Sequence, residues 1–143
     1  NNIMNHLFVP YQEALELKEL GFDEQCLAHY VFRTNTSGKG EVFLHIGKLD
    51  YDDIYLEYKQ ENIPLYSQAF DWFREKHSLY SYIEPVIVEH AASPIKFDYV
   101  ILELNISEEI IFDTLPFHSN EKAQLACLQK LIEICKDDNT TRS

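Results

Sequence analysis

Two runs of residues, 26–34 and 41–46, are rich in β-branched and aromatic side chains, and a polar loop that contains glycine, 35–40, joins them. This combination predicts a β-hairpin. Because a hairpin pairs its two strands antiparallel, it favours a mainly antiparallel sheet over the strict alternation of strands and helices that surrounds parallel sheets. A fold for this chain must accommodate that hairpin.

Helical patterns precede and follow the hairpin. Apolar side chains recur at helical spacing in residues 10–20, 65–77 and 120–136, and further strand-like runs occupy residues 82–89, 97–105 and 108–112. Pro85 lies inside the first of these runs, which predicts an edge strand or a bulge there. We expect an α+β fold, in which a mainly antiparallel sheet of about four to five strands packs with about three helices.

The length of 143 residues predicts a single globular domain, 1–143, whose ends at 1–7 and 137–143 are flexible. Within it, the order Tyr-x-x-Ala at Tyr66 repeats the order at Tyr11. One interpretation is a two-fold repeat of helix plus hairpin. The other is that the two helices share residues simply because Ala and Glu favour helices.

The chain carries 24 acidic and 12 basic residues, a formal net charge of −12. This balance argues against direct binding to the nucleic-acid backbone, which requires clustered Lys and Arg, and against anionic membrane surfaces. A solubilising surface explains the charge without a partner. The alternative is a surface that mimics nucleic acid or binds a protein with a basic surface. The candidate protein-binding residues are Asp50, Asp52, Asp53, Glu57 and Glu61.

Aromatic residues supply a second candidate site. The side chains considered are Tyr55, Tyr58, Tyr66, Trp72, Tyr80 and Tyr82. Packing in the core is the ordinary use of such residues, but Tyr and Trp also dominate binding sites. Tyr66, Trp72 and Tyr80 are therefore the candidates for a small-molecule or peptide groove between the central helix and the sheet, and this function requires an open pocket beside them.

Sequence motifs for catalysis and cofactors are missing. The chain has no Gly-x-Gly-x-x-Gly, no phosphate-binding loop and no Gly-x-Ser-x-Gly. Asp50, Asp52 and Asp53 resemble a calcium loop without its glycine and terminal glutamate. His29 and His45 are placed to face each other across the predicted hairpin, although core or surface histidines are the ordinary explanation. We expect no catalytic residue, no cofactor and no metal site.

Three cysteines, Cys26, Cys127 and Cys135, do not form an even disulfide framework. Reduced, mostly buried thiols are typical of a cytoplasmic protein. The chain also has no apolar run of about 18 residues and no secretion pattern at its N-terminus. We expect a soluble protein in the cytoplasm of the cell.

Three blocks occur in a fixed order: FVPYQEALELKELGFD at 8–23, LYSQAFDWFREK at 65–76 and AQLACLQKLIEI at 123–134. In these blocks the chain resembles short uncharacterised proteins of Bacteroidetes phages and prophages and of gut or marine viral metagenomes. That family has no established activity, so the resemblance implies an origin and carries over no catalytic residues. Together with the charge, it favours a non-enzymatic accessory protein of a bacterial host cell that binds another protein.

Overall fold

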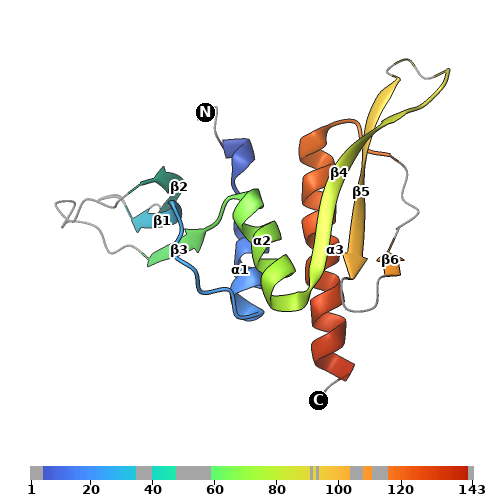
Figure 1. The fold of residues 1–143 in the computed structure, drawn as a ribbon. Coiled ribbons are helices and arrows are strands. Elements are labelled where there is room, and N and C mark those ends of the chain that lie inside the picture. The colour runs from blue at the N-terminus through green and yellow to red at the C-terminus, as the bar shows by residue number, and fades with distance from the viewer. Residues whose placement is uncertain are drawn as a thin grey trace. The chain divides into compact units, whose positions relative to one another are not determined.

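The computed structural model describes residues 5–34, 40–47, 59–90, 92, 94–103, 108–110 and 116–141 (Figure 1). The chain divides into two units, Asn1–Tyr66 and Ser67–Ser143. The first holds η1 (Asn5–Leu7), α1 (Tyr11–Glu19), β1 (Ala28–Thr34), β2 (Gly40–Ile46) and β3 (Lys59–Ile63). The second holds α2 (Tyr66–His77), which begins at the boundary, β4 (Leu79–Ile87), β5 (Ile95–Glu103), β6 (Glu108–Ile110) and α3 (Asn120–Thr141).

Helix α1 begins after Pro10 and ends in a tight reversal at Gly21. Gly21 has a φ of 106°, which a side chain rarely adopts. The N–H of Phe22 donates to the carbonyl of Leu17 at 3.0 Å, and the N–H of Gly21 donates to the carbonyl of Lys18 at 3.1 Å. This pair of bonds is the Schellman motif, and it turns Phe22 back toward the helix, where the ring is buried.

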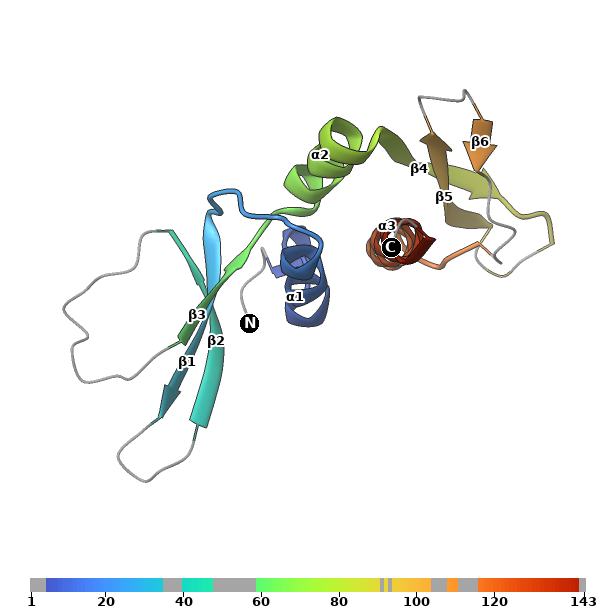
Figure 2. The ribbon, with the colours of Figure 1, turned by 90° about the horizontal axis from the view of Figure 1, so that it is seen from below.

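The predicted first hairpin is confirmed, and its first strand is central in its sheet. The strand order is β2-β1-β3, with both neighbours antiparallel to β1. Helix α1 lies on one side of this sheet (Figure 2). The rings of Tyr11 and Tyr30 meet edge to face there, with centroids 5.3 Å apart. Because side chains alternate along a strand, His29 and Val31 belong to the opposite face.

The first unit is also closed by pairing between its two ends. Phe8, just before α1, forms an antiparallel bridge with Leu65, just after β3. The N–H of Val9 donates to the carbonyl of Pro64 at 3.0 Å. Phe8 and Val9 are both buried, so this short segment links the start of α1 to the chain that leaves β3.

The second sheet has the order β4-β5-β6, which places β4 at an edge. Phe97 on β5 exchanges two backbone hydrogen bonds with Phe117, of 2.9 and 2.7 Å, so its backbone groups point away from β4. Pro85 lies opposite Phe97. Its own backbone groups therefore point outward as well. The edge position predicted from Pro85 is confirmed, because the missing N–H falls where no strand of the described residues needs a donor.

Helix α3 packs against β5 and β4 of the second unit. The hydroxyl of Ser119 accepts a hydrogen bond from the N–H of Lys122 at 3.2 Å and so caps the N-terminus of the helix. The helix continues to Thr141 and so includes residues that the sequence analysis assigned to a flexible tail. At the other end, residues 5–7 form a short 3-10 turn. The buried residues of α3 are Ala123, Cys127, Leu128, Leu131, Ile132 and Cys135.

The α+β class is confirmed, with three α-helices and two antiparallel sheets in the described residues. The strands form two three-stranded sheets in the described residues, where the sequence analysis expected one sheet of about four to five strands. β3 pairs with β1, and among the described residues the strands after α2 pair only with one another. The order helix then hairpin does occur twice, but β1 is central in its sheet whereas β4 is at an edge. The single domain and the two-fold repeat stay predictions.

Replacing Gly21 by alanine tests the reversal after α1. No atom lies within 4 Å of the position of an added Cβ, so the cost comes from the backbone conformation alone. We expect the first unit to lose about 1–2 kcal/mol of stability. Hydrogen exchange of the β1 amides measures this loss. The control is Gln12→Ala, at an exposed position of α1, and equal stability of the two variants would contradict the prediction.

The buried thiols predict a loss of stability at high pH. Burial raises the pKa of Cys127 from 9.0 to about 12. Above pH 9 the unfolded chain loses this proton and the folded chain keeps it, so the free energy of unfolding falls as pH rises from about 9 toward 12. Urea unfolding of the second unit, followed by Trp72 fluorescence, should show a smaller alkaline decline in Cys127→Ala. An identical decline would contradict this origin.

Candidate functional site

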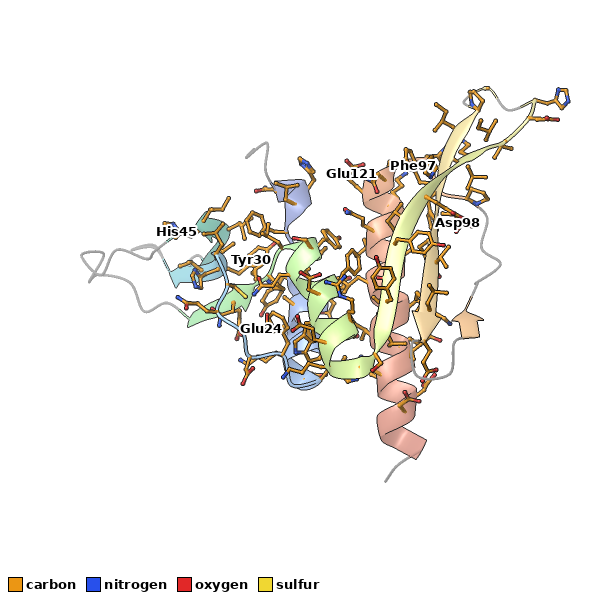
Figure 3. The ribbon with its side chains drawn as sticks, in the orientation of Figure 1. Glu24, Tyr30, His45, Phe97, Asp98 and Glu121 are labelled. Atoms are coloured by element: carbon orange, nitrogen blue, oxygen red, sulfur yellow. The ribbon has the colours of Figure 1, made fainter. Side chains whose placement is uncertain are left out.

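A pocket of about 510 Å³ lies where α1 ends and β3 runs beside it. The Schellman reversal places Phe22 in its wall and continues the chain as Asp23 and Glu24, which also line the pocket. Glu24 is labelled in Figure 3. β3 supplies Glu61, and α1 supplies Lys18 from its last turn. The whole pocket therefore belongs to the first unit. We call it the acidic pocket.

One ion pair determines the electrostatics of the acidic pocket. The ammonium of Lys18 lies 3.0 Å from Oε2 of Glu61. The Glu61 side chain is only 6% exposed, whereas that of Lys18 is 65% exposed. A buried carboxylate is costly unless it is paired, so the ion pair with Lys18 offsets the cost of burying Glu61. With Asp23 and Glu24, the pocket holds three carboxylates and one ammonium, a formal charge of −2.

The acidic pocket has the size and charge to hold a cationic group. Its volume lies within the range of about 300–1,000 Å³ that is typical of ligand sites. The buried ring of Phe22 adds an apolar wall beside the carboxylates. Long basic side chains combine an apolar stem with a charged end. The arrangement therefore suits a lysine or arginine side chain, or a small organic cation.

The structure describes one of the five predicted acidic residues. Glu61 is buried in an ion pair rather than displayed on an open surface, and it lines the acidic pocket. The other four lie outside the described residues: Asp50, Asp52, Asp53 and Glu57. The sequence analysis missed Lys18, Asp23 and Glu24. The signal for them was the acidic pair directly after Gly21 and Phe22, because a Schellman reversal sends those residues back beside the helix.

The three predicted groove residues have different surroundings. Trp72 is 4% exposed and Tyr66 is 6% exposed. Burial and the nearby charge of Glu13 raise the pKa of Tyr66 to about 12. Tyr80 is 37% exposed, and the Arg74 guanidinium lies 5.5 Å from the centroid of its ring. None of the three lines the two pockets described in this section. The aromatic groove at these residues stays a prediction.

A second pocket, of about 420 Å³, lies in the second unit, where residues of α2, α3 and the sheet line it. Phe70 of α2 lines it, as do Tyr82 of β4 and Phe97 of β5 (Figure 3 labels Phe97). Asn120 and Gln124 of α3 add two amide groups. Tyr82 was among the aromatic residues considered from the sequence. The sequence analysis did not assign Phe70 or Phe97 to a pocket. The place of Phe97 opposite Pro85 depends on the strand register, which the sequence pattern did not provide.

The predicted histidine pair is confirmed. His29 on β1 lies directly opposite His45 on β2 (Figure 3 labels His45). Burial lowers the pKa of His29, and the neighbouring charge of His45 lowers it further. Within the residues that the structure describes, no group of three or more His, Cys, Asp or Glu side chains is placed to hold a metal ion.

The comparisons with known proteins return no relative. No protein-family model matches the chain, and no curated protein or solved structure matches it significantly. In the part of the chain that the structure describes, no helix is both long and apolar enough to cross a membrane. Function must therefore be inferred from the pockets and charges themselves.

The ion pair of the acidic pocket can be tested by removing its cation. In Lys18→Met the stem is kept, but Glu61 loses the ammonium. We expect a loss of about 1–3 kcal/mol in the free energy of unfolding of the first unit. Adding Glu61→Gln should restore part of it, because the buried charge is then removed. Hydrogen exchange of β1 and β3 amides measures both effects.

The matched control for this pair is Lys122→Met, at an exposed position of α3. Surface substitutions of this kind change stability by about 0.5 kcal/mol or less. A Lys18→Met variant as stable as this control would show that Glu61 does not depend on Lys18.

Proposed function

We propose that this protein is a non-enzymatic accessory protein that binds a basic group of another protein in the acidic pocket. The observation that carries the proposal is the pocket beside the Lys18–Glu61 ion pair, with three carboxylates against one ammonium. The formal net charge of −12 supports it, because the whole chain attracts a basic partner. The phage or prophage origin and the location in the cytoplasm of a bacterial host are parts of this proposal.

An arginine or lysine side chain is the group that the acidic pocket suits best. Its methylene stem would lie against Phe22, and its charged end would meet Asp23 and Glu24. Glu61 would add a carboxylate that Lys18 already holds in one position, so little side-chain entropy is lost on binding. Exposed carboxylates at the rim attract a basic partner over a range limited by salt, about 8 Å at physiological ionic strength. Binding should therefore be strongest at low salt.

An arginine-rich peptide is a direct probe, and the same peptide with citrulline in place of arginine is its uncharged match. We expect saturable binding of the arginine peptide at low ionic strength, and none of the citrulline peptide. Asp23→Asn with Glu24→Gln should weaken binding by about five- to tenfold. Isothermal titration calorimetry measures the affinity.

The control for total charge is Glu75→Gln with Glu89→Gln, which removes two exposed carboxylates of the second unit. It should keep most of the affinity. Equal weakening by the two double variants would mean that only the net charge acts, and it would contradict the pocket. Backbone NMR shifts during the same titration locate the site, and they should be largest at Phe22, Asp23 and Glu24.

The second candidate function is a small-molecule or peptide binder, and the pocket of the second unit favours it. Three aromatic rings and two amides converge there, an arrangement typical of pockets for a mostly apolar ligand. The NMR titration separates the two candidates. Shifts confined to Phe70, Tyr82 and Phe97 would assign binding to this second pocket and count against the acidic one.

A further inference from the structure

His29 and His45 occupy a hydrogen-bonded pair of an antiparallel ladder. The N–H of Gly47 donates to the carbonyl of Leu27 at 2.7 Å, so the backbone groups of Leu27 point toward β2. The direction of the backbone N–H and C=O groups repeats every second residue along a strand, so the backbone groups of His29 also point toward His45. The two side chains therefore stand side by side on one face, with Cα atoms about 5.5 Å apart.

Asn62 extends this pair into a row of three side chains. It lies opposite His29 on β3, on the other side of the central strand. Because the backbone groups of His29 point toward β2, His29 and Asn62 form a non-hydrogen-bonded pair, whose Cα atoms are closer, at about 4.5 Å. Side chains of such pairs approach one another most closely. His45, His29 and Asn62 therefore cross the sheet from strand to strand.

This row lies on the face of the sheet opposite α1. Tyr30, the neighbour of His29, contacts Tyr11 of α1. Glu61, the neighbour of Asn62, contacts Lys18 of α1. Alternation along each strand then places His29 and Asn62 on the other face. Both histidines are half-buried and Asn62 is exposed, so an ion can reach the row from solvent.

The ring of His29 has an unsatisfied atom. Its Nδ1 is buried and has no hydrogen-bond partner among the described residues. Buried polar atoms are rarely left without a partner, and each such atom calls for an explanation. The neutral ring of a histidine is the form that binds a metal ion.

We propose that His29, His45 and Asn62 form a site for a divalent transition-metal ion of the zinc type. Neutral imidazoles are ligands that Zn²⁺, Ni²⁺ and Cu²⁺ accept, whereas Mg²⁺ and Ca²⁺ prefer oxygen. The two rings supply two nitrogen ligands, the amide oxygen of Asn62 supplies a third, and water completes the shell. The bound ion cross-links all three strands of the first sheet. The two histidines lie on the face opposite the Tyr11–Tyr30 contact, whereas Asn62 also lines the acidic pocket. The zinc proposal stands without the proposed function, because neither histidine lines that pocket.

Zinc titration of the full chain tests this site. We expect one saturable Zn²⁺ per chain at pH 7.5 by calorimetry, and no response to Mg²⁺. His29→Gln and His45→Gln should each weaken zinc binding by at least about tenfold. His118→Gln, an exposed histidine in the second unit, is the matched control and should keep full affinity. Unchanged zinc binding in His45→Gln, or no saturable binding in the wild type, would overturn the proposal.

A gain of affinity guards against a variant that merely misfolds. Asn62→Asp replaces the amide oxygen with a carboxylate at the same position, and a carboxylate is a stronger ligand for zinc. We expect this variant to bind Zn²⁺ several-fold more tightly than the wild type, and to gain thermal stability when zinc is added. Unchanged or weaker zinc binding in a folded Asn62→Asp variant would remove Asn62 from the site and overturn the three-residue proposal.

Discussion

The two-sided pairing of β1 is the constraint on which the first unit depends. Its backbone is bonded to β2 on one side and to β3 on the other. Pairing along these two edges fixes the register of every side chain, so a slip of one residue would exchange the two faces. One face then receives α1 through Tyr30 and Glu61, and the other carries His29 and Asn62. Both candidate sites of this unit thus follow from a single register.

The acidic pocket shows how a helix end becomes a binding feature. Gly21 allows the reversal that ends α1, and the same reversal brings the acidic residues Asp23 and Glu24 beside Glu61. Carboxylates that are separated along the chain by more than half the length of the unit become neighbours. Lys18 supplies a counter-charge to the buried member of the group, Glu61, which offsets the cost of burying that carboxylate.

Local signals predicted most of the elements. The helical spacing of apolar residues predicted the three helices, and the position of Pro85 at an edge followed from its missing N–H. The partition into two sheets was not predictable, because β3 is a short strand of mostly polar residues that is recognisable only by its pairing with β1. The acidic pocket was missed for a similar reason: it combines α1 with β3, two elements distant in the sequence. The histidine pair was found because hairpin neighbours are close in the chain.

The outward-facing backbone of Pro85 affects the hairpin of β4 and β5, because β4 lies at the edge of its sheet. An open strand edge offers a ladder of donors and acceptors to any other extended chain. At Pro85, the third residue from the end of β4, this ladder is interrupted, because proline offers a carbonyl and no donor. Pairing with a second extended chain is therefore disfavoured at this point of the edge.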